Sequence, residues 1–360
     1  YEMSASLVGS EMCIRDSVMS LYNIVDQIFI GQCVGELGNA ATNVAFPFTT
    51  LCIATALAFG IGGASGFNLN LGAGEKEKTP YFIGVSASMM FIIGVVLSVV
   101  GLTALKPLLL FFGSTDTVLP YAMEYTKYLA LGFPFAIISS GGSHLVRADG
   151  SPKFSMACNL VGAIVNVILD YLFVMVFNWK MAGAAIATVI GQILASIMVI
   201  WYLIHFKTIK LHGKHFVPQL KIVGRTVHLG MAQCLNQLAI MFVQVVMNKS
   251  LTYYGALSPY GADIPLACTG IVMKVNQVYF SICIGVAQGI QPIASFNRGA
   301  GKNDRVKKTY KLAVSCNTII STIAFIIFQL FPRQIISIFG SGGPEYFRFS
   351  INFFRIFLFM

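Results

Sequence analysis

Long apolar runs dominate this sequence, and they constrain its fold more than any other feature. A helix needs about 20 apolar residues to span the hydrocarbon core of a bilayer. Charged residues make up only 11% of the chain, against about 25% in soluble domains. The sequence therefore predicts an all-α membrane protein with ten helices, over 18–35, 40–71, 81–105, 121–146, 154–178, 181–206, 225–255, 264–297, 306–331 and 345–360.

The two ends of the chain depart from this pattern. Residues 1–17 contain no long apolar core and lack the architecture of a signal peptide. They resemble translated sequencing-adapter read-through, and we set them aside as a non-native segment. The final apolar run is still in progress at Met360, so we expect the second half of the fold to be incomplete.

Basic residues alternate between the connections and predict the orientation of the chain. One set of connections carries fifteen and the other carries three, namely Lys106, Lys180 and Arg333. Because cytoplasmic loops are enriched in Lys and Arg, we place the first set, and the N-terminus, in the cytoplasm of a multi-pass protein in the cell (inner) membrane. The fifteen are Lys76, Lys78, Arg147, Lys153, Lys207, Lys210, Lys214, Lys221, Arg225, Arg298, Lys302, Arg305, Lys307, Lys308 and Lys311.

An internal repeat divides the helices into two groups. Residues 60–74 and 287–301 match at a shift of 227, which pairs Asn70 with Asn297 and aligns two Gly-Ala-Gly blocks. Helices 2 and 8 correspond, so the repeat unit is six helices. An even number gives both halves the same orientation, a common plan in secondary transporters. We predict an N-terminal lobe over 18–206 (helices 1–6), a cytoplasmic linker over 207–224 and a C-terminal lobe over 225–360 (helices 7–10), with a binding site between the lobes.

Several other classes of function lack their signatures here. No Walker-type phosphate loop, zinc spacing or basic surface interleaved with aromatic residues is present, which excludes ATP, metal and nucleic acid as expected ligands. The linker pair His212 and His215 has metal-ligand spacing but no further ligands, so we interpret this segment as a solvated linker. An intramembrane enzyme is disfavoured because no HExxH or GxSxG motif occurs, and we expect neither catalytic residues nor a cofactor.

Two carboxylates within the apolar runs are the leading functional candidates. Asp26 and Asp170 lie nine and eight residues before the outer ends of their helices, and Thr188 lies seven residues after the outer start of the next. At 1.5 Å per residue these offsets are roughly 10–14 Å. A carboxylate in the bilayer core usually faces a cavity or a partner. We therefore expect the three residues to share one layer.

Further polar residues extend this layer. Asn159, Asn166 and Asp170 are spaced by seven and four residues, which places them on one helical face, and Gln192 lies four residues after Thr188. Lys274, about ten residues into helix 8, is a candidate for the central cavity. A purely structural hydrogen-bond network between helices remains the alternative for this set.

The expected chemistry is the binding of a coupling ion. Burial and a second nearby carboxylate both raise the pKa of an aspartate, so a pair of them can hold or exchange protons. Loss of charge on protonation can then shift helices between two packings. Sodium is the alternative ion, because the oxygens of Asp26, Asn166, Asp170 and Thr188 are hard ligands.

These features resemble the MATE (multidrug and toxin extrusion) family. The resemblance spans about residues 18–360 and rests on segments that are each weak but specific together. They are Tyr22-Asn23-Ile24-Val25-Asp26 with Gly31, the Gly-Ala-Gly blocks at 72–74 and 299–301, Arg147-Ala-Asp-Gly150, Asn166-Val-Ile-Leu-Asp170 and Gly183-Ala-Ala-Ile-Ala-Thr188.

The resemblance implies twelve helices in two lobes and export of drugs by a monomer, driven by inward flow of protons or sodium ions. It also implies a first-lobe cation site at Asp26, Asn166, Asp170 and Thr188. Some members carry an acidic residue in helix 7, but residues 230–255 contain none, which favours coupling in the first lobe. A flippase for lipid-linked oligosaccharides is the alternative function. The two aspartates favour amphipathic, cationic drugs as substrates instead.

Overall fold

The computed structural model describes residues 29–30, 34, 36–112, 114, 116–257, 263–339 and 344–358. In this part of the chain every regular element is helical, and two compact units are present. The N-terminal unit comprises the residues up to Leu238 together with 291–306. The C-terminal unit comprises residues 239–290 and those from Lys307 onward.

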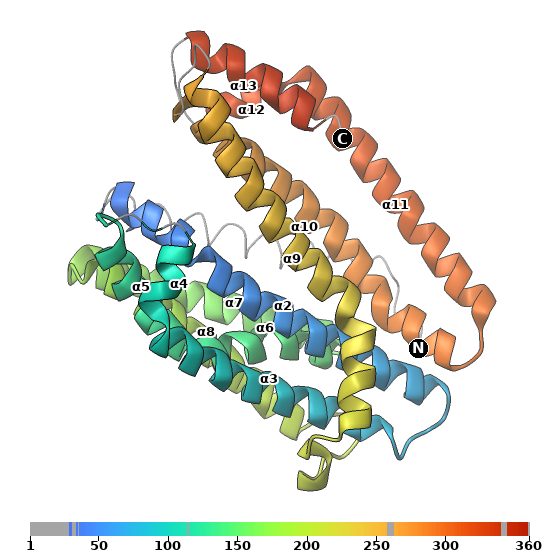
Figure 1. The fold of residues 1–360 in the computed structure, drawn as a ribbon. Coiled ribbons are helices and arrows are strands. Elements are labelled where there is room, and N and C mark those ends of the chain that lie inside the picture. The colour runs from blue at the N-terminus through green and yellow to red at the C-terminus, as the bar shows by residue number, and fades with distance from the viewer. Residues whose placement is uncertain are drawn as a thin grey trace. The chain divides into compact units, whose positions relative to one another are not determined.

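The N-terminal unit is a bundle of antiparallel helices (Figure 1). Its largest interfaces join α2 to α6 and α3, and α7 to α8. Its elements are α2 (Glu36–Gly72), α3 (Thr79–Thr103), α4 (Leu105–Phe111), α5 (Leu119–Leu131), α6 (Phe133–Ala148), α7 (Pro152–Asp170), the π-helix η1 (Tyr171–Val176), α8 (Lys180–Ile204), the 3-10 helix η2 (Gly213–Phe216) and the first half of α9 (Leu220–Ala256).

The C-terminal unit contains the second half of α9, most of α10 (Asp263–Gly299), α11 (Asn303–Leu330), α12 (Pro332–Phe339) and α13 (Pro344–Phe357). Its small core contains Val272 and Val275 of α10, Ile336 of α12 and Phe354 of α13. The hydroxyls of Tyr279 on α10 and Ser321 on α11 lie 2.6 Å apart.

Seven helices in the described ranges are long and apolar enough to cross a membrane, and the bent pair α5–α6 raises this to eight. The chain is therefore a multi-pass membrane protein, as predicted. Trp179 and Trp201 flank the apolar part of α8. They are 22 positions apart in the sequence, or about 33 Å, which matches a bilayer core of about 30 Å.

The helix predicted over 121–146 is broken in the structure. This segment is two helices, α5 and α6, bent by 58°. The bend has a local cause, because Pro134 has no backbone N–H to donate to the carbonyl of Ala130. The buried hydroxyl of Ser98 donates to that carbonyl instead, at 2.6 Å, which satisfies it inside the apolar layer. The short helices α4 and α12 were also not predicted.

The internal repeat is confirmed in the backbone. Helices α2 and α10 both contain 37 residues, and their bounds differ by the predicted shift of 227. Asn70 Nδ2 donates to Gly66 O at 2.7 Å, and its repeat partner Asn297 donates to Ile293 O at 2.9 Å. Gly74 and Gly301 then turn the chain with positive φ angles of 81° and 73°, which glycine adopts without strain.

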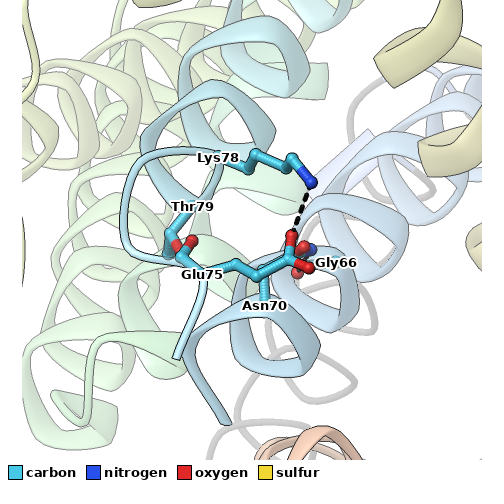
Figure 2. A network of polar contacts seen from close by, with 5 residues as sticks. All are labelled: Gly66, Asn70, Glu75, Lys78 and Thr79. Atoms are coloured by element: carbon cyan, nitrogen blue, oxygen red, sulfur yellow. Dashed lines mark hydrogen bonds and ion pairs between the residues drawn. The ribbon is translucent and has the colours of Figure 1, made fainter. Parts of the chain in front are cut away.

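Charge differs between these two equivalent turns. In the first turn, Lys78 pairs with Glu75 at 2.8 Å, and the backbone carbonyl of Glu75 accepts a bond from the hydroxyl of Thr79 (Figure 2). This pairing lowers the pKa of the exposed Glu75 carboxyl, chiefly through its hydrogen bond with Lys78. In the second turn, Arg298 donates to the amide oxygen of Asn303.

The two repeat copies also touch each other. A Cβ on Gly72 would lie 2.0 Å from the carbonyl oxygen of Phe296, and one on Gly299 would lie 1.9 Å from that of Leu69. Gly72 and Gly299 are repeat partners, and so are Leu69 and Phe296, so the two contacts are equivalent. The contact between α2 and the end of α10 is therefore two-fold symmetric, and only glycine allows the backbones to approach this closely.

Candidate cation-coupling site

Close contact between α7 and α8 sets the geometry of the candidate site. A Cβ on Gly162 would lie 2.9 Å from Gly191 O, and one on Gly191 would lie 2.6 Å from Gly162 O and 3.2 Å from the Cβ of Asn166. Small residues at such crossings let membrane helices approach each other closely. The crossing brings together the polar side chains one turn after Gly162 on α7 and one turn before Gly191 on α8.

Asn166 and Thr188 meet across this interface. Asn166 Nδ2 donates to Thr188 Oγ1 at 3.3 Å, and Thr188 Oγ1 donates in turn to the carbonyl of Ala184 at 3.0 Å. Asn166 is 2% exposed, and its amide oxygen has no hydrogen-bond partner among the described residues. An acceptor is therefore left buried in an apolar layer, which is costly without a donor or a cation.

Asp170 lies one turn beyond Asn166 and is fully buried. It is the last residue of α7, and the helix continues from it as the π-helix η1. Such π segments are rare and frequently occur at functional sites. Asp170 therefore combines a buried carboxyl with an irregular backbone, the two features expected where protonation has to change packing.

A compact turn fixes η1 against α8. Trp179 donates its backbone N–H to Phe173 O at 2.8 Å, and their rings stack with centroids 4.9 Å apart. Asn178 and Lys180 both adopt left-handed backbone, with φ angles of 56° and 47°. Non-glycine residues rarely do so, so the turn is tightly constrained and holds Asp170 and Thr188 on adjoining helices.

Asp26, the other predicted carboxylate, lies outside the described residues. Two helical residues that follow it closely in the sequence, Phe29 and Ile30, are described. Ile30 is fully buried, and the ring centroid of Phe29 lies 6.5 Å from that of Tyr171, which directly follows Asp170. The described end of helix 1 therefore packs beside η1.

The remaining predicted site residues fall into different surroundings. Asn159 is half-buried and donates to Ser143 Oγ on α6 at 3.0 Å and to Ser155 O at 2.8 Å. Gln192 is half-buried, and its buried amide oxygen has no partner among the described residues. The side chain of Lys274 on α10 lies outside the part that is described.

The described site can supply oxygen ligands to a small cation or hold a proton. Asn166 and Thr188 meet between α7 and α8, and Asp170 lies one turn beyond Asn166, whereas Asn159 contacts Ser143 on α6. Over the described ranges, no group of three His, Cys, Asp or Glu residues could hold a metal ion.

A second polar cluster was missed in the sequence because its residues are far apart along the chain. Asp149 is buried at the end of α6 and accepts bonds from Tyr202 Oη at 2.8 Å, Lys207 N at 2.8 Å and Thr208 N at 3.0 Å. Tyr202 Oη also lies 2.6 Å from Ser151 Oγ. This cluster ties the end of α8 and the start of the linker to the α6–α7 turn.

Two histidines also differ from the sequence interpretation. His144, which no sequence motif singles out, is buried and contacts the guanidinium of Arg147. His215 is only 5% exposed and packs edge-on against Tyr81 of α3, with ring centroids 4.8 Å apart. Part of the linker is therefore docked on the bundle. The spacing His212-x-x-His215 reflects a capping interaction, in which His212 N donates to His215 Nδ1 at 3.0 Å.

An open hollow of about 420 Å³ lies between α10 and α11 in the C-terminal unit. Its lining includes Ala287, Asn317 and Ser321. Their repeat partners, Gly60, Met90 and Gly94, contact α6 in the N-terminal unit. The hollow is therefore equivalent to the place that α6 fills in the first repeat, and its shape reflects the repeat and does not by itself indicate a ligand site.

Comparison with known proteins places this geometry in context. A family model described as MatE matches residues 12–172 and 232–360. The multidrug export protein MepA of Staphylococcus saprophyticus is 25% identical over 92% of this chain and 72% of its own. The probable multidrug resistance protein YoeA of Bacillus subtilis is 23% identical over 93% and 73%.

The same fold is present in solved structures. A multidrug resistance MATE family transporter of the MOP superfamily, in an outward-facing conformation, superimposes with a TM-score of 0.89 at 22% identity. The match covers 98% of this chain and 78% of the other. A MOP superfamily transporter from Pyrococcus furiosus, described as having a binding pocket of reverse polarity, gives the same score, identity and coverage.

Proposed function

Because this chain belongs to the MatE family of membrane transporters, we propose that it exports amphipathic, cationic drugs across the plasma membrane in exchange for an inward-moving cation. The observation that carries this proposal is the fully buried carboxyl of Asp170 beside the Asn166–Thr188 pair. The relatives named as multidrug exporters support the substrate class. We further propose that the chain acts as a monomer with its N-terminus in the cytoplasm.

The coupling step follows from the cost of burying charge. An ionised Asp170 is unfavourable in the apolar bundle, so a proton or a cation stabilises the closed packing of α7, η1 and α8. Release of that ion restores the charge and favours a packing in which water reaches the site. Since a ligand shifts an equilibrium only by its differential affinity for the two states, the ion and the drug must favour opposite packings.

We propose the proton as the coupling ion and sodium as the second candidate. A proton requires only the carboxyl of Asp170 and its predicted partner Asp26. Sodium would also use the buried amide oxygen of Asn166, which has no donor among the described residues. No cofactor is needed for either ion.

Transport measurements in proteoliposomes distinguish proton coupling from sodium coupling. The chain is reconstituted with a fluorescent amphipathic cation, and gradients of protons and of sodium are imposed separately at matched membrane potential. We expect a pH gradient alone to drive accumulation of the dye. Dependence on sodium with no response to pH would overturn the proton assignment, and no response to either gradient would overturn coupled export.

A further inference from the structure

The two copies of the repeat differ in chemistry at one matching helical face. In the first copy this face belongs to α3 and contains Pro80, Tyr81 and Gly84. It is covered by the linker, because the Tyr81 ring packs against His215, and a Cβ on Gly84 would lie 2.3 Å from the carbonyl oxygen of His215. Close backbone contact and aromatic packing hold this cover in place.

In the second copy the same positions on α11 are Lys307, Lys308 and Lys311. All three side chains are exposed. Tyr310, on the same turn, is 65% exposed, whereas its repeat partner Ile83 is fully buried. The two glycine turns share the same backbone hydrogen bonds, such as Glu75 N to Asn70 O and Lys302 N to Asn297 O, although α11 begins three residues earlier than the equivalent of α3. Tyr310 also lines the hollow between α10 and α11, so it is the three exposed lysines that point to a different partner for this face.

The position of these residues along α11 identifies the surroundings. The helix contains 28 residues, or about 42 Å at 1.5 Å per residue, which equals a bilayer including its headgroup layers. From Leu312 to Leu330 the sequence is free of charge, and this part is long enough for the hydrocarbon core. The residues from Asn303 to Lys311 are therefore left at the level of the headgroups, where tyrosine is also enriched.

We propose that Lys307, Lys308 and Lys311 form a binding surface for the phosphate headgroups of anionic phospholipids. Charge complementarity carries this assignment. Residues 302–311 hold five basic side chains and one acidic side chain, Asp304. The equivalent residues 75–84 are electrically balanced, with Lys76 and Lys78 against Glu75 and Glu77. Lysines near a membrane surface attract anionic lipid, and their long stems let the ammonium groups reach the headgroups.

This surface is independent of the coupling site, so its test does not rely on transport. The chain has two tryptophans, which are removed as Trp179→Phe and Trp201→Phe before Tyr310→Trp introduces one indole beside the lysines. The protein is placed in vesicles that contain brominated phosphatidylglycerol or brominated phosphatidylcholine. Quenching of the indole by each lipid then gives their relative association constant at this position.

We expect phosphatidylglycerol to be preferred roughly three- to tenfold. The preference should fall to about one when Lys307→Gln, Lys308→Gln and Lys311→Gln are combined, because electrostatic attraction is then lost. A matched control replaces three exposed lysines elsewhere, Lys76→Gln, Lys210→Gln and Lys221→Gln, and should keep the preference.

Equal quenching by the two lipids in the parent protein, or an equal loss in the control, would overturn the proposal. A second measurement covers the case in which the added indole disturbs the helix. With native tryptophans, mass spectrometry of the intact protein should show fewer retained phosphatidylglycerol molecules for the triple α11 variant than for the control. Equal retention would count against the surface.

Discussion

At the scale of single residues, the cost of burying a polar group decides where function lies. Asp170 and Asn166 are almost completely removed from solvent, and the amide N–H of Asn166 donates to the hydroxyl of Thr188. Structural networks between membrane helices use the same residue types. A charged carboxyl differs from them, because its burial depends on whether a proton or a cation is present.

The first prediction concerns this carboxyl. Asp170→Asn should abolish drug export while the protein still folds and enters the membrane, because the amide has nearly the same size as the carboxyl but cannot take up or release a proton. Asp26→Asn should behave in the same way. Dye efflux and resistance of cells expressing each variant measure the effect, and the exposed Asp116→Asn serves as the control. Normal resistance in either site variant would refute the coupling role.

At the scale of elements, close backbone contact decides how the helices and the linker dock. The Gly162–Gly191 crossing brings α7 against α8, and Ser98 supports the bend that Pro134 introduces between α5 and α6. The linker docks by the same means, with His215 against Tyr81 and Gly84 of α3. Each contact joins residues that are distant in sequence, so none follows from helix periodicity.

Docking of the linker should depend on pH. Burial, reinforced by the charges of Lys214 and His212, lowers the pKa of His215 below its usual value near 6.5. The neutral Nδ1 of His215 accepts a hydrogen bond from His212 N. Among the described residues of α3, the titratable side chain that contacts His215 is Tyr81. Docking should therefore be fully stable above about pH 6.5 and should weaken as the pH falls towards the lowered pKa, since the undocked histidine binds the proton first.

Hydrogen exchange over residues 207–219, corrected for the intrinsic rate, measures this effect between about pH 7.5 and pH 5.5. His215→Gln keeps an acceptor but cannot titrate, so exchange in this variant should lose its pH dependence. His205→Gln changes an exposed histidine and should retain it. Equal pH dependence in all three proteins would show that His215 does not control docking.

At the scale of the whole molecule, the repeat is the organising feature. Helices α2 and α10 have equal lengths, their ends carry the same glycine turn and asparagine hydrogen bond, and the two copies meet at Gly72 and Gly299. Since a two-fold contact uses the same positions of both partners, a change on one side should have its counterpart on the other.

The last prediction uses this symmetry. Gly72→Val and Gly299→Val each place a branched side chain against a backbone carbonyl, and each should lower stability by a similar amount, about 1–3 kcal/mol. Gly224→Val is the control, because a Cβ there meets nothing within 4 Å. Thermal unfolding in detergent measures the effect. If one variant behaves like the control and the other does not, the contact is not symmetric.

The sequence by itself determined the membrane-spanning character, the repeat and most helices of this protein. These properties depend on local composition and on similarity along the chain, so apolar run length and one matching pair of blocks were sufficient. It also predicted that Asp170 and Thr188 share one layer with Asp26, because the depth of a residue in a straight helix follows from counting. In the structure Thr188 is hydrogen-bonded to Asn166, which lies one turn before Asp170. The placement of Asp26 in that layer remains a prediction.

Only the tertiary structure decided the rest. The bend at Pro134, the π segment after Asp170, the bonds of Asp149 to the linker and the burial of His215 all depend on which distant backbone groups come close. Periodicity cannot indicate that the hydroxyl of Ser98 donates to the carbonyl of Ala130, or that Gly84 packs against the backbone of His215. The physical reason is that hydrophobicity acts on each segment separately, whereas hydrogen bonding and close packing are properties of pairs.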